Sequence, residues 1–275
     1  MGDLQLSEKG QLIGKGRLAE VFEWGDTQVL KLFTAERDPA AIAAEARVSQ
    51  LVHEAGVPTP GTGGVIEVGG RRGIIYDRAV GSPMVGQLTA KPWKLLSFGR
   101  MLAQLHASVH ERDVDRLPSQ REQLEHYIVS ADLPTVYRDR ALQRLRELPQ
   151  GTALCHGDFH PDNVLVDGST ATIIDWTTAC SGNPVGDFAR TSLILQLGAL
   201  PAGASPWTRI AVRSGRALFY WSYSQRYRRL RRVSQRDLRP WILPIAVARL
   251  GQDVTAERDQ LLTLIGQDTP TRRGT

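Results

Sequence analysis

Residues 156–163 read His-Gly-Asp-Phe-His-Pro-Asp-Asn, and another aspartate follows at position 175. This order of Asp158, Asn163 and Asp175 contains the groups that phosphoryl transfer requires. One carboxylate accepts the proton of a hydroxyl group, and two further oxygen ligands hold magnesium under a triphosphate. The stretch therefore predicts a phosphotransfer site, and the rest of the chain is interpreted around it.

The residues on either side of this stretch predict a hairpin. Residues 154–156 form a short apolar run before the loop, and residues 164–166 and 172–174 have the composition of strands. Asp167-Gly168 between them is a strong turn signal. We expect the hairpin to bring Asn163 and Asp175 close enough to bind one metal ion.

The run from His156 to Asn163, with Asp175-Trp176, resembles the signature of the aminoglycoside phosphotransferase and choline kinase family. Gly157 and Trp176-Thr177 replace residues typical of true protein kinases, which favours the branch that phosphorylates small molecules. The resemblance implies an α+β fold of the protein-kinase-like two-lobe type. A small antiparallel β N-lobe is expected over residues 1–77, and a mainly helical C-lobe over residues 78–275.

A glycine-bearing segment near the N-terminus has the pattern of strand, turn and strand. Gly14 and Gly16 would let backbone amides approach phosphate oxygens, and Val21 would lie against a nucleotide base. The segment resembles a kinase glycine-rich loop, with Ala19 in the position of the third glycine. Taken alone, an ordinary glycine-bearing hairpin explains it equally well.

Lys31 stands in an otherwise apolar strand, residues 29–33, where a lysine needs an anionic partner. Asp38-Pro39 then predicts the start of a helix that reaches about Ala55 and contains Glu45. The resemblance implies that Lys31 contacts the α- and β-phosphates and that Glu45 orients it through an ion pair. The alternative for Glu45 is a solvated helix charge.

Gly69-Gly70 predicts a second hairpin that completes an N-lobe sheet of roughly five strands. Residues 76–79 follow it in the place of the hinge. The resemblance implies that backbone groups around Tyr76 and Arg78 bind the adenine edge. It also implies ATP and Mg²⁺ as cofactors, with Asp158 as the base and Asn163 and Asp175 as metal ligands.

Three predictions concern the C-terminal half. Asp187 is expected to begin a helix and to cap its first amides. Aromatic residues at positions 219–227 are interpreted as core rather than as a substrate box. Pro240 and Pro244 are expected to limit where the next helix starts.

Charge is unevenly distributed in a chain of net charge +5 and pI near 9.5. Between Trp207 and Leu250 there are eleven arginines and one acid, Asp237. A solvated basic helical face is one interpretation, and an anionic partner or substrate is the other. The basic C-terminal half disfavours a cationic aminoglycoside acceptor without excluding it, and a neutral or anionic alcohol fits the charge better. A choline-type acceptor also stays open, because Tyr220, Trp221 and Tyr223 offer aromatic faces.

The bulk composition excludes several classes. With 275 residues, 41% apolar and 23% charged, the chain is typical of a globular protein, and no stretch is apolar enough for a membrane span. We expect a cytoplasmic protein with two buried thiols, Cys155 and Cys180. The expected partner is a small-molecule hydroxyl acceptor rather than a membrane or nucleic acid, and the oligomeric state stays open. A protein kinase and a catalytically silent nucleotide-binding module are the alternatives.

Overall fold

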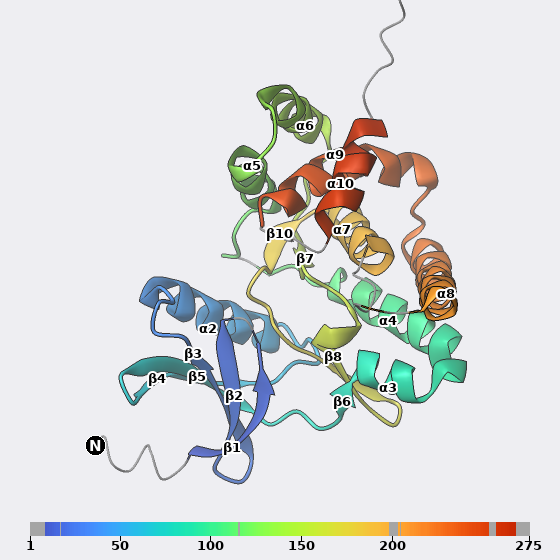
Figure 1. Cartoon of the computed structure of the whole chain (residues 1–275). Coiled ribbons are helices and arrows are strands. Elements are labelled where there is room, and N and C mark those ends of the chain that lie inside the picture. The colour runs from blue at the N-terminus through green and yellow to red at the C-terminus, as the bar shows by residue number, and fades with distance from the viewer. Residues whose placement is uncertain are drawn as a thin grey trace, which may run out of the picture. The chain divides into compact units, whose positions relative to one another are not determined.

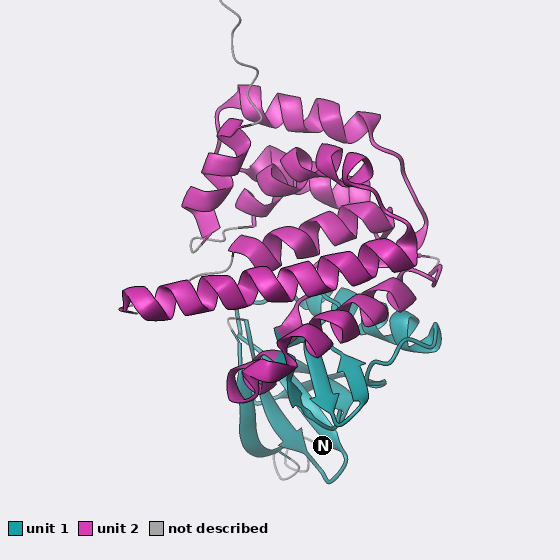
Figure 2. Ribbon diagram, turned by 90° about the vertical axis from the view of Figure 1, so that its right-hand side faces the viewer, with its two compact units in different colours: residues 1–84, 162–178 teal, residues 85–161, 179–275 magenta. Residues whose placement is uncertain are grey.

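The computed structural model describes residues 9–16, 18–114, 116–197, 203, 205–252 and 257–267. The chain divides into two units, which are coloured separately in Figure 2. The first unit comprises residues 1–84 and 162–178, and the second comprises residues 85–161 and 179–275. The boundary between the units thus falls within the His156–Asn163 stretch: Asp158 belongs to the second unit, and Asn163 and Asp175 belong to the first.

The first unit is built on a five-stranded antiparallel sheet with the order β1-β2-β3-β5-β4. Its strands are β1 (Lys9–Lys15), β2 (Ala19–Trp24), β3 (Gln28–Phe33), β4 (Thr62–Val68) and β5 (Arg71–Asp77). The β4–β5 turn is Gly69-Gly70, with φ angles of 58° and 74° that glycine adopts without strain. The predicted hairpin and the predicted number of strands are both confirmed.

Helix α2 (Pro39–Glu54) packs against β4 and β5 of this sheet (Figure 1). It begins where expected, because the Asp38 side chain accepts a 3.0 Å hydrogen bond from the amide of Ala40. Ile42 and Ala46 on its inner face form a core cluster with Phe33 of β3 and Ile74 of β5. This packing fixes the side of α2 that carries Glu45 toward the sheet.

A three-stranded sheet, of order β6-β8-β9, also lies in the first unit. It contains β6 (Ser82–Pro83), β8 (Val164–Asp167) and β9 (Thr170–Ile173), and Gly168 turns between the last two with φ 57°. Val164 pairs with Ile173 in the antiparallel β8–β9 register. Asn163 immediately precedes one strand and Asp175 closely follows the other, so the predicted hairpin is confirmed.

The second unit is mainly helical. Figure 2 shows its longest helix, α8, running alongside α4, and the two pack together. Its helices are α3 (Met84–Ala90), α4 (Leu95–Val109), α5 (Gln120–Ser130), α6 (Thr135–Glu147), α7 (Pro184–Leu197), α8 (Pro206–Arg231), α9 (Gln235–Leu250) and α10 (Arg258–Gln267).

A two-stranded ribbon in the second unit pairs β7 (Ala153–Cys155) with β10 (Cys180–Gly182). Cys155 lies opposite Cys180, and both are buried free thiols, as predicted. Burial raises the pKa of the Cys155 thiol, which keeps it protonated and unreactive near neutral pH. The two cysteines are therefore packing residues of the ribbon.

Two predictions about helix starts are wrong. Helix α9 begins at Gln235 and continues through both Pro240 and Pro244, because a Ser234–Asp237 capping box starts it and most of its later residues are buried. Helix α7 begins at Pro184, and the Asn183 side chain accepts the 2.9 Å hydrogen bond of its first turn. Asp187 does not cap that helix, and its carboxylate is used elsewhere.

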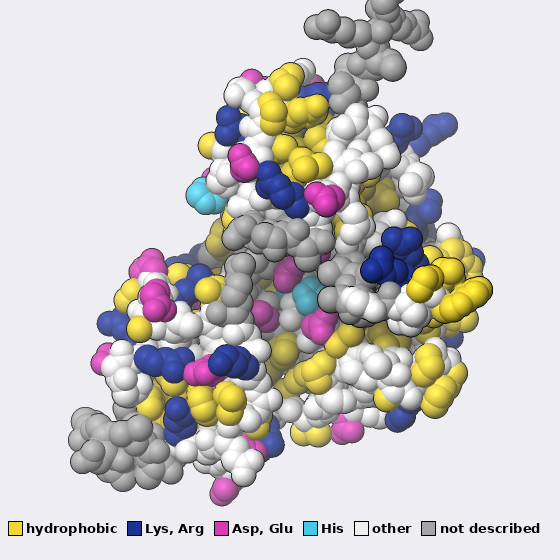
Figure 3. Space-filling view, in the orientation of Figure 1, with side chains coloured by type: hydrophobic (Ala, Val, Ile, Leu, Met, Phe, Trp, Pro, Cys, Tyr) yellow, Lys and Arg dark blue, Asp and Glu magenta, His cyan; other side chains and the backbone are white. Residues whose placement is uncertain are grey.

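In the described part of the chain, none of the helices has the length and hydropathy needed to cross a membrane. Arginine and lysine side chains lie beside a hydrophobic patch over α8 on the face shown in Figure 3. Trp207 and Ile210 of α8 are 80% and 55% exposed, and Arg213 and Arg229 of the same helix are exposed as well. The arginine-rich region is thus partly a solvated face, as one interpretation of the sequence proposed.

Candidate active site

The Lys31 side chain extends from β3 and contacts two carboxylates of the first unit. Its Nζ lies 2.6 Å from Oε1 of Glu45 and 3.1 Å from Oδ1 of Asp175. Burial by itself would lower the pKa of Lys31, but the charges of Asp175 and Glu45 outweigh it and raise the pKa. The lysine therefore carries a fixed positive charge at the end of the β8–β9 hairpin. Glu45 is buried, so it is not a solvated helix charge.

Asp175 is held in an unusual backbone conformation. Its φ angle is 64°, in the left-handed region that costs a non-glycine residue about 1 kcal/mol. The Thr177 hydroxyl donates a 2.7 Å hydrogen bond to Oδ1 of the same carboxylate that contacts Lys31. Backbone strain that is retained by surrounding contacts is typical of functional positions.

Asn163 precedes β8 and Asp175 follows β9, so both residues lie at the open end of the β8–β9 hairpin, opposite its turn. The backbone also links this region directly, since the amide of Ile174 donates a 3.0 Å hydrogen bond to the carbonyl of Asn163. An amide oxygen and a carboxylate are hard oxygen donors, the type that Mg²⁺ prefers, and Mg²⁺ needs few protein ligands when phosphates complete its shell. The donor set of this hairpin fits a magnesium ion.

The glycine-bearing segment forms the β1–β2 turn. Gly14 pairs with Val21 in the antiparallel register, and the amide of Gly16 donates a 2.8 Å hydrogen bond to the carbonyl of Ala19. A Cβ atom added at Gly14 or Gly16 would meet no atom of another residue closer than 3.6 Å or 3.5 Å respectively. Neither glycine has a positive φ, so the described fold itself does not require glycine at either position.

The two hinge candidates occupy the end of β5 and the residue after it. The Tyr76 hydroxyl lies 3.3 Å from the Ser49 hydroxyl on α2, and burial raises the pKa of Tyr76 to about 12. Arg78 contacts Glu23 at 3.1 Å, and its amide donates a 2.8 Å hydrogen bond to the carbonyl of Thr27. Their side chains are thus engaged with the first unit itself.

Asp158 lies in the second unit, in the loop that leaves β7. Its amide donates a 3.2 Å hydrogen bond to Nδ1 of the buried His156, and His160 Nε2 lies 3.3 Å from its Oδ2. Burial alone would raise the pKa of Asp158, but His160, Arg190 and Arg249 outweigh it and hold the pKa well below its usual range. The carboxylate is therefore ionised at neutral pH. Both histidines brace this loop.

The Asp187 carboxylate holds the loop that contains Asp158 through hydrogen bonds to its backbone. It accepts hydrogen bonds from the amides of His156 at 2.7 Å and Gly157 at 2.9 Å. Nε2 of His106 and Nε2 of His110 also lie 3.1 and 3.2 Å from its Oδ2. Burial would raise the pKa of Asp187, but its hydrogen bonds with His106 and His110 hold the pKa well below its usual range.

The His106, His110 and Asp187 cluster has a composition that could hold a metal ion. The Tyr223 hydroxyl lies 2.7 Å from His106 Nδ1, and the Tyr227 hydroxyl lies 2.6 Å from His110 Nδ1. Because burial lowers the pKa of His106, its imidazole is neutral; if it donates from Nε2 to Asp187 it must accept at Nδ1, so the Tyr223 hydroxyl donates. The Tyr227 hydroxyl also donates a 3.4 Å hydrogen bond to the carbonyl of Pro184. Both ring nitrogens of each histidine and both oxygens of Asp187 thus have hydrogen-bond partners. We therefore interpret the cluster as a structural network. The aromatic residues at 223 and 227 are therefore core, as predicted.

Sequence reasoning missed Arg190 on α7 and Arg249 on α9, both of which approach Asp158. Arg190 Nη2 and Arg249 Nη1 lie 3.9 and 3.8 Å from Asp158 Oδ1. Arg249 stands in an otherwise apolar run, residues 245–250, which is the same signal that identified Lys31. Arg190 is followed by Thr191 and Ser192, so its sequence neighbours give no such signal. Arg249 was counted as part of a basic face, but its side chain is 8% exposed.

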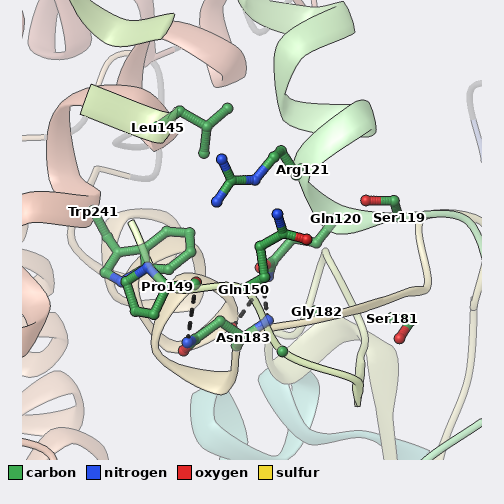
Figure 4. Close-up of a pocket in the computed structure, with 11 residues that line it drawn as sticks. Ser119, Gln120, Arg121, Leu145, Pro149, Gln150, Ser181, Gly182, Asn183 and Trp241 are labelled. Carbon is green, nitrogen blue, oxygen red and sulfur yellow. Dashed lines mark hydrogen bonds between the residues drawn. The ribbon is translucent and has the colours of Figure 1, made fainter. Parts of the chain in front are cut away.

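A pocket in the second unit lies beside the N-terminus of α5 (Figure 4). Gln120 crosses it, with its side-chain carbonyl accepting a 2.9 Å hydrogen bond from the amide of Asn183. Asn183 in turn donates a 3.3 Å hydrogen bond to the carbonyl of Pro149. None of the expected site residues lines this pocket, and its polar groups tie the α7 entry loop to α5.

Solved structures of related fold cover nearly the whole chain. A thermostable mutant of aminoglycoside phosphotransferase APH(4)-Ia, in a ternary complex with ADP and hygromycin B, has 18% identity and a TM-score of 0.65 over 96% of this chain and 95% of its own. Amicoumacin kinase hAmiN, in complex with AMP-PNP, Ca²⁺ and Ami, has 15% identity and a TM-score of 0.61 over 96% and 88%. Macrolide 2'-phosphotransferase MphH from Brachybacterium faecium has 18% identity and a TM-score of 0.53 over 99% and 98%.

These matches confirm the expected α+β, protein-kinase-like fold, with a five-stranded antiparallel sheet in one part and helices in the other. No curated protein sequence matches the chain at a significant level. A model of the phosphotransferase enzyme family, APH, matches residues 9–231, which include the β1–β2 turn, Lys31, Asp158 and Asp175. The chain therefore belongs to the phosphotransferase enzyme family.

Proposed function

We propose that this protein transfers the γ-phosphate of ATP to a hydroxyl group of a small molecule. The observation that carries the proposal is the position of Lys31 Nζ, 2.6 Å from Glu45 and 3.1 Å from Asp175. One ammonium group fixed beside a candidate metal ligand is suited to binding the α- and β-phosphates next to the metal.

The nucleotide contacts are proposed for the first unit. Gly14 and Gly16 leave the β1–β2 turn open to phosphate oxygens. The fold would accept a Cβ atom at either position, so the presence of glycine is better explained by the approach of a ligand. Val21 is assigned to the base. Backbone groups around Tyr76 and Arg78 are assigned to the adenine edge, because the side chains of both residues already have partners in this unit.

Asn163 and Asp175 are the residues proposed to hold Mg²⁺. When bound, the ion would neutralise charge that develops on the phosphate oxygens. Lys31 already contacts Asp175, so it would keep that carboxylate oriented.

Asp158 is proposed as the group that accepts the acceptor's proton. As the hydroxyl oxygen forms its bond to the γ-phosphorus, the bond from that phosphorus to the bridging oxygen of ADP breaks, and the hydroxyl proton moves to Asp158. The low pKa of Asp158 makes it a weak base. Such a base suits a loose transition state, in which the hydroxyl loses its proton late. Most of the rate enhancement then comes from positioning the hydroxyl group.

The solved relatives support a small-molecule acceptor. One structure contains ADP and hygromycin B, another is an amicoumacin kinase with AMP-PNP and Ami, and a third relative is named a macrolide 2'-phosphotransferase. A peptide acceptor is less suitable, because only eight residues separate Asp175 from the start of α7 at Pro184. That segment contains the short strand β10 and leaves little chain for a peptide platform.

The test is ADP release from magnesium-ATP by the purified protein, with aminoglycosides, amino alcohols, sugars and nucleosides as acceptors. Asp158→Ala should lower the stimulated rate by about 10²- to 10⁴-fold while nucleotide affinity is retained. Asp139→Ala, a matched change at an exposed carboxylate on α6, should leave the rate unchanged. Equal rates for wild type and Asp158→Ala would refute the assignment of the base. Failure to bind magnesium-ATP in calorimetry would instead indicate a silent module.

A further inference from the structure

The surroundings of Asp158 in the second unit contain two arginines that do not hydrogen-bond to it. The distances of 3.8 and 3.9 Å from Oδ1 to the guanidinium nitrogens exceed the length of a hydrogen bond. Polar groups that lie more than 3.5 Å apart can be linked by a third group, such as a water molecule or a ligand atom, that hydrogen-bonds to both.

Both guanidinium groups are held by hydrogen bonds to residues other than Asp158. Arg249 donates two hydrogen bonds to Glu257, from Nε at 2.5 Å and from Nη2 at 2.8 Å, which leaves Nη1 as the nitrogen nearest Asp158. Arg190 donates from Nη2 to Oε1 of Gln252 at 2.6 Å. The arrangement therefore fixes both cationic groups beside the carboxylate without closing the gap.

Arg190 is costly to keep in this position. Its side chain is 9% exposed, and its buried Nε has no hydrogen-bond partner among the described residues. Burial lowers the pKa of Arg190, and Asp158 at 3.9 Å opposes that shift. A buried guanidinium with so few partners is expected where a ligand supplies the missing acceptors.

We propose that the acceptor alcohol carries an oxyanion, a carboxylate or a phosphate, which Arg190 and Arg249 bind while its hydroxyl donates to Asp158. This inference rests on the proposed function. Arginine suits the task because it donates to planar or tetrahedral oxyanions from several nitrogens at once. A cationic acceptor would place an ammonium group against the two guanidiniums, and the nearby carboxylate of Glu257 is already paired.

The experiment uses four probes that share a vicinal diol: glycerol, D-glycerate, glycerol 3-phosphate and 3-amino-1,2-propanediol. They differ in one group, which is neutral, a carboxylate, a phosphate or an ammonium. Initial rates of ADP release from magnesium-ATP are compared for the wild type, Arg190→Gln, Arg249→Gln and the control Arg239→Gln. Arg239 is exposed on the same helix as Arg249, ten residues away or about 15 Å along the axis.

We expect kcat/KM at least about tenfold higher for one of the two anionic probes than for glycerol, and the favoured probe distinguishes carboxylate from phosphate. Arg190→Gln and Arg249→Gln should raise KM for that probe by about 10- to 100-fold, and should lower kcat/KM for that probe by a larger factor than kcat/KM for glycerol, so that the preference is lost. Arg239→Gln should retain the preference. A purely structural role of the arginines would slow the reaction of all probes alike.

Higher kcat/KM for glycerol or the aminodiol would overturn the inference and leave the proposed function intact. If magnesium-ATP does not bind, both fail together. If nucleotide binds but none of the probes reacts, thermal unfolding is measured with inorganic phosphate in the presence of saturating magnesium-AMP-PNP. A saturable stabilisation that Arg249→Gln abolishes and Arg239→Gln retains supports an oxyanion site, and its absence in the wild type overturns it.

Discussion

The backbone amide of His156 donates a 2.7 Å hydrogen bond to the carboxylate of Asp187, which lies 31 residues further along the chain. Asp187→Ala removes this acceptor, and also the partner of the Gly157 amide and of two buried histidines. Because each buried donor left unsatisfied costs about 1–3 kcal/mol, we expect a loss of at least about 3 kcal/mol in the free energy of unfolding. Urea denaturation measures this loss.

Asp139→Ala provides the control for that experiment, since Asp139 is an exposed acid on α6. It should change the free energy of unfolding by no more than about 0.5 kcal/mol. Similar losses for both variants would show that the Asp187 network does not stabilise the fold.

The Lys31–Glu45 ion pair leads to a prediction about coupling. Lys31→Met leaves the Glu45 carboxylate buried without its 2.6 Å partner, at an expected cost of about 1–3 kcal/mol. Adding Glu45→Gln removes the buried charge, so the double variant should be more stable than Lys31→Met alone. Denaturation of the four proteins of this cycle measures the coupling, and strictly additive effects would argue against it.

Gly16 allows the nucleotide-binding role of the β1–β2 turn to be separated from folding. Because an added Cβ would meet no neighbour closer than 3.5 Å, Gly16→Ala should change the free energy of unfolding by no more than about 0.5 kcal/mol. Its methyl group would obstruct phosphate oxygens, so affinity for magnesium-ATP should fall by about tenfold or more. Calorimetric titration tests this, and unchanged affinity would remove Gly16 from the proposed site.

Local features of the structure were predictable because their signals are local. Asp38-Pro39 fixed the start of α2 through a cap and a preset φ angle, and the glycine and Asp-Gly turns marked two hairpins. The Asn163–Asp175 relationship followed from one such hairpin. These features need only residues within about a dozen positions of one another.

The parts that sequence reasoning missed depend on distant partners. Asp187 looks like a helix cap because it lies in the first turn of α7, yet its partners His156 and His106 lie 31 and 81 residues away. Arg249 looks like one of many basic side chains until α9 is packed against α7. Burial of α9 likewise outweighs the cost of two prolines within it, which no local rule anticipates.

Gly99 on α4 provides a test of the packing against α8. A Cβ atom added there would lie 2.9 Å from the Ser222 Cβ and 3.0 Å from the carbonyl oxygen of Phe219, both on α8. Gly99→Ala should therefore lower the free energy of unfolding by about 1–3 kcal/mol, despite the higher helix propensity of alanine. Gly86→Ala on α3, with no neighbour within 4 Å of the added atom, should instead raise it by up to about 1 kcal/mol. Changes of the same sign in both variants would contradict this account.

His106 predicts how stability depends on pH. Burial lowers the pKa of His106 to about 3, whereas the ordinary value in an unfolded chain is about 6.5. Between these values the unfolded chain binds the proton and the folded chain does not, so stability is greatest above pH 6.5. It falls by up to about 1.4 kcal/mol per pH unit as the pH drops toward 3. The lowered pKa of Asp187 adds to the loss below about pH 4.

His106→Gln should flatten this dependence, because an amide can still donate to Asp187 but does not titrate. The substitution also alters packing, which shifts the free energy of unfolding at every pH. The quantity to measure by urea denaturation is therefore the change of this free energy between pH 6.5 and pH 4.5. His126→Gln, at an exposed position on α5, should keep the wild-type slope. A wild-type slope in His106→Gln would mean that other groups take up the protons on acid unfolding.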